Sequence, residues 1–196
     1  DYDEAMEIYS SALIKSEELN NKLWLGRSLR NIGNIYFGTC DKDTALDYWE
    51  KALAIAEEIG DKIGMRLSIF NIGIMHSSEG NHDKGLGCYE RSLAIAEEIG
   101  DKRGIGYSLN NIGNVHAEKG DFDTALNYYE QSLAIQEELG DTVGVGNSLI
   151  RIGSIHAGEV NIDKALDYYG RSLAIREELG DKRGMGECII GIGLVH

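Results

Sequence analysis

Residues 133–141 read LAIQEELGD, and close copies of this stretch begin at Leu53, Leu93 and Leu173. Each copy starts 40 residues after the previous one. The dipeptide Ile-Gly recurs with the same period, at residues 32–33, 72–73, 112–113, 152–153 and 192–193. A fixed period of this length is typical of repeat proteins, in which each period folds as one unit that packs against its neighbours.

Each period contains two helical patterns. In residues 101–140 the first apolar stripe consists of Leu109, Ile112 and Val115. The second consists of Ala125, Leu126, Tyr129, Leu133 and Leu139. Both have helical spacing, and a Gly-Asp pair ends each of them. We expect Gly140 to adopt the left-handed conformation that ends a helix and Asp141 to cap the next one. No strand pattern is present, so the chain is predicted to be all-α.

The period also predicts the domain organisation, which is a single array over residues 1–196 with about ten helices. Full units are expected at residues 21–60, 61–100, 101–140 and 141–180. Residues 1–20 match only the second helix of a unit, and residues 181–196 match only the first. Because a unit is incomplete at each end, we expect the chain to be a fragment of a longer protein.

Composition excludes several function classes. The 196 residues carry a formal net charge of −14, which disfavours nucleic acid and anionic membranes as partners. No stretch has the roughly 20 apolar residues that a membrane-spanning helix needs. Three cysteines without a Cys-x-x-Cys pair indicate reduced thiols in a cytoplasmic protein rather than disulfides or a zinc site.

The sequence resembles a tetratricopeptide repeat (TPR) array over essentially its whole length. The residues that carry the resemblance are Leu109, Ile112, Gly113, His116, Gly120, Ala125, Tyr129, Ser132 and Leu133. Its departures are histidine in place of the usual tyrosine after Tyr36, the missing inter-repeat proline, and a unit longer than the common length of about 34 residues. The longer unit resembles those of Pins-type adaptors, kinesin light chains and bacterial TPR regulators. The resemblance implies a right-handed α-solenoid whose concave groove, lined by first helices, binds a protein or peptide without catalysis.

Glycine recurs in the middle of the first helices, at Gly33, Gly73, Gly113, Gly153 and Gly193. Glycine there costs about 0.5–1 kcal/mol relative to alanine, so a repeated glycine indicates that the partner helix comes close. We expect these glycines to pack against Ala45, Ala125 and Ala165. Gly85 stands where the other units have this alanine, and it should loosen the second unit.

An asparagine ladder is the strongest binding signal. Asn31, Asn71 and Asn111 recur at one position of the first helix, and Asn34 and Asn114 recur three residues later. A carboxamide both donates and accepts hydrogen bonds, which suits the backbone of an extended peptide. Matching asparagines in TPR arrays line the groove. Hydrogen bonds between neighbouring helices, or simple inheritance of the repeat, are the alternatives.

The other expected groove positions change character from unit to unit. Arg27 and Arg30 make the first unit basic, and Leu67, Phe70 and Ile74 make the second apolar. Tyr107, Asn110, Asn111 and Asn114 make the third polar, and Asn147, Ile150, Arg151 and Ser154 make the fourth mixed. We expect a peptide with an apolar anchor at Phe70 and an acidic group near the two arginines. The lysines of chaperone-binding TPR domains are absent, since Tyr107 and Asn110 occupy the third-unit sites.

Three further patterns are interpreted as structural, and we expect no metal, no cofactor and no catalytic residue. The histidines His76, His116, His156 and His196 lie in successive units, too far apart for one metal ion, and are expected to replace a packing tyrosine. Adjacent glutamates such as Glu137 and Glu138 point about 100° apart on a helix and should form a solvated edge. Gly-x-Gly pairs such as Gly104 and Gly106 lack the third glycine and the preceding strand of a dinucleotide site.

Two alternatives to a plain binding scaffold stay open. One is a regulatory or sensor domain of a larger signalling or effector protein, of which bacterial proteins are one source. The other is end-to-end self-association, because Ile189, Ile192 and Val195 are predicted to be exposed on the last helix.

Overall fold

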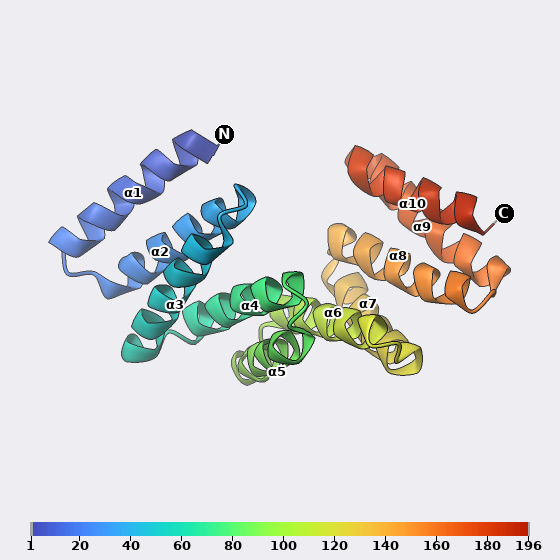
Figure 1. Ribbon diagram of the computed structural model, residues 1–196, viewed down its shortest axis with the longest axis horizontal. Helices are drawn as coiled ribbons and strands as arrows, with labels where there is room; N and C mark the ends of the chain where they lie inside the picture. Colours follow the sequence, from blue (N-terminus) through green and yellow to red (C-terminus); the bar gives the residue numbers. More distant parts are fainter. Residues whose placement is uncertain (1, 196) are drawn as a thin grey trace. The chain divides into compact units, whose positions relative to one another are not determined.

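The computed structural model describes residues 2–195, which form ten α-helices and no strand (Figure 1). The helices are α1 (Tyr2–Glu18), α2 (Lys22–Gly38), α3 (Lys42–Ile59), α4 (Lys62–Ser78), α5 (His82–Ile99), α6 (Lys102–Glu118), α7 (Phe122–Leu139), α8 (Thr142–Gly158), α9 (Ile162–Leu179) and α10 (Lys182–Leu194). The predicted all-α class is therefore confirmed. None of these helices is long and apolar enough to cross a lipid bilayer.

The chain divides into two compact units, residues 1–100 (unit 1) and residues 101–196 (unit 2). In unit 1 each helix packs against the next, and the first helices α2 and α4 also touch. Unit 2 repeats this arrangement, with α6 touching α8 and α8 touching α10. The short turns between consecutive helices make them antiparallel neighbours, so each unit is a stack of helical hairpins.

The Gly-Asp pairs end one hairpin and begin the next, as predicted. Gly60, Gly100, Gly140 and Gly180 all adopt left-handed φ angles between 64° and 69°. The Asp141 carboxylate then accepts a hydrogen bond of 3.1 Å from the Gly144 N–H and so caps α8. Asp61 stands at the equivalent position but makes no side-chain cap for α4.

The turn inside each hairpin also needs one left-handed residue. Gly80 and Gly120 fill this position with φ of 78° and 80°. Cys40 and Val160 fill it in the other two hairpins, with φ of 65° and 60°. A β-branched residue such as Val160 is strained in this region of backbone space.

The mid-helix glycines make room for aromatic rings rather than for the expected alanines. A Cβ atom on Gly113 would lie 2.7 Å from the Tyr129 ring, and one on Gly33 would lie 2.7 Å from the Trp49 ring. The expected alanine contributes only its carbonyl oxygen. In the case of Ala125 this oxygen would lie 3.3 Å from the Cβ atom on Gly113. The space was thus predicted correctly and its occupant was not.

Three further expectations about packing differ from the contacts in the structure. Gly85 does not leave a gap, because the Ser77 hydroxyl lies where an alanine methyl group would be. Gly193 approaches nothing within 4 Å, unlike the other mid-helix glycines. On α10, Ile192 and Val195 are partly buried against the cluster around Tyr169 rather than exposed.

Candidate functional site

The predicted groove residues lie on α2 and α4 in unit 1 and on α6 and α8 in unit 2. Their spacing of three and four residues places them along one side of each helix. Most are half-buried or exposed, as a binding surface requires. Asn110 and Ile150 are the exceptions, with side chains only 8% and 9% exposed. Asn110 donates to the Ser148 hydroxyl at 2.9 Å, so its carboxamide serves the interior instead of the surface.

In unit 1 the asparagine ladder forms hydrogen bonds between helices. The Asn34 Oδ1 atom accepts from Asn71 Nδ2 at 2.8 Å and from Trp49 Nε1 at 3.0 Å. This geometry supports the alternative that the asparagines link neighbouring helices. Among the described residues, Asn34 Nδ2 and Asn71 Oδ1 still have no partner, so one donor and one acceptor remain for a ligand.

In unit 2, too, each asparagine of the ladder uses only one of its two carboxamide groups in a hydrogen bond. The Tyr129 hydroxyl donates to Asn114 Oδ1 at 2.9 Å, and Asn111 Nδ2 donates to the Tyr107 carbonyl at 2.9 Å. Within residues 101–195, Asn114 Nδ2 and Asn111 Oδ1 have no hydrogen-bond partner. Burial is the main reason that the pKa of Tyr129 rises to about 12, so this phenol stays protonated and donates at every physiological pH.

The basic positions of unit 1 lie in a partly desolvated environment. Burial lowers the pKa of Arg30, and the nearby charges of Arg27 and Arg66 lower it further, whereas Asp61 raises it. Arg27 also lies over the Trp24 ring, with 5.3 Å from the guanidinium carbon to the ring centroid. The apolar residue expected as an anchor, Phe70, packs against Tyr89 at a centroid distance of 5.6 Å and remains half-buried.

A hollow of about 580 Å³ lies between α1 and α2 in unit 1. Asn31, Asn34 and Ile35 line it from α2. From α1 it is lined by Tyr2, Ala5 and Tyr9, which the sequence analysis did not select. Their spacing on one helical stripe was the available signal, but it was interpreted only as a match to a second helix.

A second hollow, of about 320 Å³, lies in unit 2. Its walls are the predicted site residues Ile150, Arg151 and Ser154 of α8 together with Tyr169 of α9 and Glu187, Ile190, Gly191 and Leu194 of α10. Gly191 occupies the position held by asparagine in Asn31, Asn71 and Asn111. Because Gly191 has no side chain, the Tyr169 ring packs directly against the α10 backbone at this point, and a Cβ atom on Gly191 would lie 2.6 Å from that ring.

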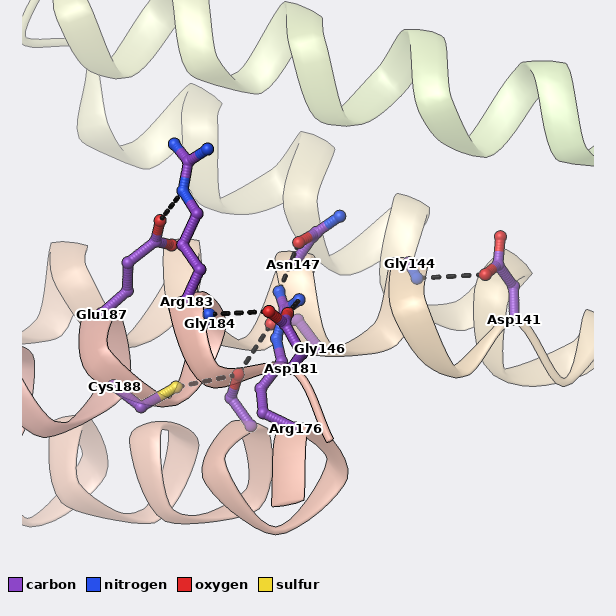
Figure 2. A network of polar contacts seen from close by, with 11 residues as sticks. Asp141, Gly144, Gly146, Asn147, Arg176, Asp181, Arg183, Gly184, Glu187 and Cys188 are labelled. Atoms are coloured by element: carbon purple, nitrogen blue, oxygen red, sulfur yellow. Dashed lines mark hydrogen bonds and ion pairs between the residues drawn. The ribbon is translucent and has the colours of Figure 1, made fainter. Parts of the chain in front are cut away.

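Polar contacts within unit 2 occupy hydrogen-bonding atoms of two predicted residues, Asn147 and Tyr107, and Figure 2 shows the network around Asn147. The Arg176 side chain, in a residue only 6% exposed, donates to Asn147 Oδ1 and forms an ion pair of 2.5 Å with Asp181. Cys188 Sγ lies 3.3 Å from the Ser172 hydroxyl, which donates to the Gly146 carbonyl at 2.9 Å. The Oδ1 atom of Asn147 therefore accepts a hydrogen bond within the fold and is not available to a ligand.

Tyr107 is the second such residue, because its hydroxyl donates to Asp141 at 3.0 Å. Burial and this hydrogen bond raise the pKa of Tyr107. Asp181 is the aspartate of the next Gly-Asp junction after Asp141. The Gly184 N–H and the Arg176 guanidinium lower its pKa.

His116 and His156 replace the packing tyrosine, as expected. Tyr36 stacks on Tyr48 with 5.5 Å between ring centroids. His116 stacks on Tyr128 at 5.5 Å, and His156 stacks on Tyr168 at 5.6 Å. His196 lies outside the described residues. Over residues 2–195, no group of three or more His, Cys, Asp or Glu side chains is arranged to hold a metal ion.

The paired glutamates lie on an exposed edge, where they form ion pairs that the sequence analysis missed. Lys22 pairs with Glu58, Lys62 with Glu98 and Lys102 with Glu138. The preceding glutamate pairs with an arginine of another second helix, Glu57 with Arg91 at 2.7 Å and Glu137 with Arg171 at 3.5 Å. These pairs are solvent-exposed, so each contributes about 0.2–1 kcal/mol at most.

Comparisons with known proteins agree with this architecture. A family model described as "Tetratricopeptide repeat" matches residues 1–58 and 65–138. No curated protein matches the chain. BtubC (BKLC) from P. vanneervenii superposes with a TM-score of 0.81 at 19% identity, over 99% of this chain and 82% of that one.

Two further solved structures have the same fold. A Rap protein complexed with competence and sporulation factor has a TM-score of 0.80 at 19% identity, over 99% of this chain and 60% of that one. A signal transduction ATPase with a tetratricopeptide repeat sensor, from Pyrococcus horikoshii, has a TM-score of 0.76 at 16% identity, over 89% of this chain and 27% of that one. The chain thus spans less than two thirds of either protein, and identities this low establish the fold alone.

Proposed function

The chain belongs to the tetratricopeptide repeat family, and on that basis we propose that it is a non-enzymatic protein that binds a protein or peptide segment along its first helices. The observation that carries the proposal is the pair of hollows. One adjoins Asn31 and Asn34 in unit 1, and the other adjoins Arg151 and Ser154 in unit 2. Concave sites with a few polar groups among apolar walls are the usual form of ligand sites.

The unused polar atoms support an extended peptide as the ligand. Asn34 Nδ2 and Asn114 Nδ2 are donors, whereas Asn71 Oδ1 and Asn111 Oδ1 are acceptors, so a peptide backbone can be matched on both its C=O and its N–H groups. Arg27 and Arg30 favour an acidic group in the ligand, and the net charge of −14 disfavours nucleic acid and anionic membranes. The Rap structure, solved in complex with a named factor, supports peptide or protein binding by analogy of fold.

A cytoplasmic location is part of the proposal. The three cysteines Cys40, Cys88 and Cys188 are all free thiols, which is the usual state in a reducing compartment.

The experiment is a peptide array probed with the wild-type chain, followed by affinity measurements on the peptides that bind. The variant Asn111→Ala/Asn114→Ala should weaken binding about tenfold, because two backbone hydrogen bonds of about 0.5–1.5 kcal/mol each are lost. Gly170→Ala is the matched control, since nothing lies within 4 Å of Gly170 on the outside of α9. Unchanged affinity in the double variant would contradict the role of the ladder.

A regulatory or sensor role within a larger protein is the second candidate. It is favoured by the signal transduction ATPase, in which the matched region is 27% of the chain and the name identifies a tetratricopeptide repeat sensor. The sequence that flanks this chain in its gene tests the idea, because a neighbouring kinase, ATPase or DNA-binding domain would support it.

Self-association is the third candidate, and the structure changes the residues that it would use. Ile189 is 56% exposed, as expected, whereas Ile190 and Leu194, at 64% and 81%, take the place of Ile192 and Val195. Light scattering over a range of concentrations tests this, and a monomer throughout would exclude it.

A further inference from the structure

We propose that the hollow of unit 2 is a specificity pocket for one bulky apolar group that carries a neighbouring carboxylate, with Arg151 as its anion-binding residue. This inference rests on the proposed function, because it assigns a ligand chemistry to part of the same surface. It concerns the hollow between α8, α9 and α10, whose volume is about 320 Å³. That is near the lower limit of ligand pockets, so it fits one side chain rather than a large cofactor.

The walls of the pocket are apolar. Ile150, Ile190 and Leu194 contribute aliphatic surface, and the largely buried Tyr169 lines the hollow beside Gly191. In the other units an asparagine or an arginine stands at the position of Gly191. Gly191 adds no side chain of its own, so the open volume of the hollow is available to an apolar group.

The hydroxyl groups in the pocket already have partners. The Tyr169 hydroxyl donates to Ser154 Oγ at 3.2 Å, and the Ser154 hydroxyl donates to the Ile150 carbonyl at 2.8 Å. Both protons are therefore used within unit 2. A ligand gains little from hydrogen-bonding groups deep in this pocket and more from apolar surface.

Of the two charged residues at the rim of the pocket, one is paired and the other is not. Glu187 is paired with Arg183, with 3.4 Å between Oε1 and Nε. Arg151 is exposed, and its guanidinium has no hydrogen bond or ion pair with any other described residue. The unpaired positive charge of Arg151 therefore favours an anionic group in the ligand. A guanidinium binds a carboxylate through two parallel hydrogen bonds.

The pocket can be filled without disturbing the fold. Asn114 stands at the position of Ser154 in the preceding repeat, and it accepts a hydrogen bond of 2.9 Å from the Tyr129 hydroxyl. Ser154→Asn should therefore preserve a partner for the Tyr169 hydroxyl while it occupies space in the hollow. Gly191→Asn is less suitable, because its Cβ atom would press on the Tyr169 ring.

The probes are N-acetyl-phenylalanine, its neutral amide, and acetate, each titrated into the ¹⁵N-labelled chain and followed by amide chemical shifts. We expect saturable shifts at Ser154 and Gly191 with N-acetyl-phenylalanine. Binding of its amide should be about tenfold weaker, which corresponds to about 1.4 kcal/mol for one charge-assisted interaction. Acetate should cause no saturable shift, because it lacks the apolar group.

The variants separate the two parts of the site. In Arg151→Gln the affinities for the acid and the amide should become equal. Ser154→Asn should lower both affinities, and Gly170→Ala should change neither affinity. Equal affinity of the wild-type chain for acid and amide would overturn the proposal, as would shifts that are insensitive to Ser154→Asn. If array peptides bind but these probes do not, the pocket assignment is wrong and the proposed function stands. If the probes bind here but no peptide binds anywhere, the pocket stands and the proposed function is wrong.

Discussion

Units 1 and 2 contain the same helical hairpins but fill the space between them with different chemistry. In unit 1 the second helices α3 and α5 bury Ala56 and Ala96, and one turn earlier they bury Ala52 and Ser92. In unit 2 the alanines are replaced by Gln136 on α7 and Arg176 on α9, and both helices bury a serine one turn earlier. The backbone repeat is therefore compatible with an apolar filling in one place and a hydrogen-bonded filling in another.

One serine in each unit illustrates the difference. Ser148 in unit 2 accepts from Asn110 and donates to Gln136 Oε1 at 2.7 Å. Ser68 in unit 1 occupies the same position and is 1% exposed, yet its Oγ atom has no hydrogen-bond partner among the described residues. The glutamine that would reach it is replaced by Ala56. A buried polar group costs free energy unless it is paired, so the same residue stabilises unit 2 and weakens unit 1.

The largest effect is expected at Arg176. Arg176→Ala removes a packed side chain and leaves the Asn147 acceptor unpaired, so the free energy of unfolding should fall by about 3 kcal/mol. Arg176→Met keeps most of the packing and should cost about half as much. Urea unfolding followed by circular dichroism measures both, with hydrogen exchange of α8 and α9 to confine the effect to unit 2. Equal losses for the two variants would show that the charge contributes everything and packing nothing.

The next effect is expected where a first helix approaches an aromatic ring. Gly113→Ala would place a methyl group 2.7 Å from the Tyr129 ring and should cost about 2 kcal/mol by overpacking. Gly170→Ala meets nothing within 4 Å and should instead gain about 0.5–1 kcal/mol from helix propensity. The thermal midpoints of the two variants should therefore move in opposite directions. A gain in both would mean that the ring shifts freely.

The paired serines give the most direct test of the comparison. Ser148→Ala leaves the carboxamides of Asn110 and Gln136 without this partner and should cost about 1–2 kcal/mol. Ser68→Ala removes an unpaired hydroxyl and should be neutral or stabilising by up to about 1 kcal/mol. The difference between the two urea midpoints is the quantity to compare. Similar losses in both variants would refute the distinction between the units.

A smaller, stabilising effect is expected in the turn between α8 and α9. Val160→Gly relieves a left-handed φ of 60° at a residue that is 77% exposed, and it should gain about 1 kcal/mol. Gly120→Val introduces the same strain in the preceding hairpin and serves as the reverse control. A loss of stability in Val160→Gly would show that the entropy of glycine outweighs the strain.

The pH dependence of unit 2 should be the smallest of these effects. The pKa of Asp181 is lowered in the folded protein, chiefly by the Gly184 N–H and then by Arg176. The resulting stabilisation is present above the unfolded-state pKa of about 3.9 and is lost as the pH falls through the lower, folded value. Asp181→Asn should therefore reduce the drop in urea midpoint between pH 5 and pH 3. An unchanged drop would mean that other carboxylates determine it.

The sequence was sufficient for most of the fold. The period of 40 residues and its Gly-Asp pairs predicted the ten helices, and the left-handed conformation of Gly140 followed from helix-capping chemistry. Arg176 was not predicted because its equivalents are Ala56, Ala96 and Gln136, so no recurring pattern marks a buried arginine. Its role depends on Asn147 and Asp181, which come close only in the folded chain.

The candidate site was less predictable, because groove positions and interface positions are neighbours on the same helix. A rotation of one residue about the helix axis separates Asn111, which is half-buried, from Asn110, which is buried against Ser148. Periodicity cannot distinguish two adjacent asparagines. The hollow of unit 2 was not predicted as a pocket, because residues of α8, α9 and α10 form it together only in the folded chain.

The Gly-Asp junctions have a consequence for how such a chain can change. Each junction uses the same two residues and the same left-handed turn, so it places the same demands on the backbone that enters and leaves it. A 40-residue segment cut at two junctions can in principle be duplicated, deleted or exchanged without a new linker. Unit 2 restricts this freedom, because the buried Arg176 forms an ion pair with Asp181 across the junction at Gly180. The bonds that cross the junction at Gly60, from Asn71 to Asn34 and from Arg91 to Glu57, are more exposed, so recombination should be penalised less at Gly60 than at Gly180.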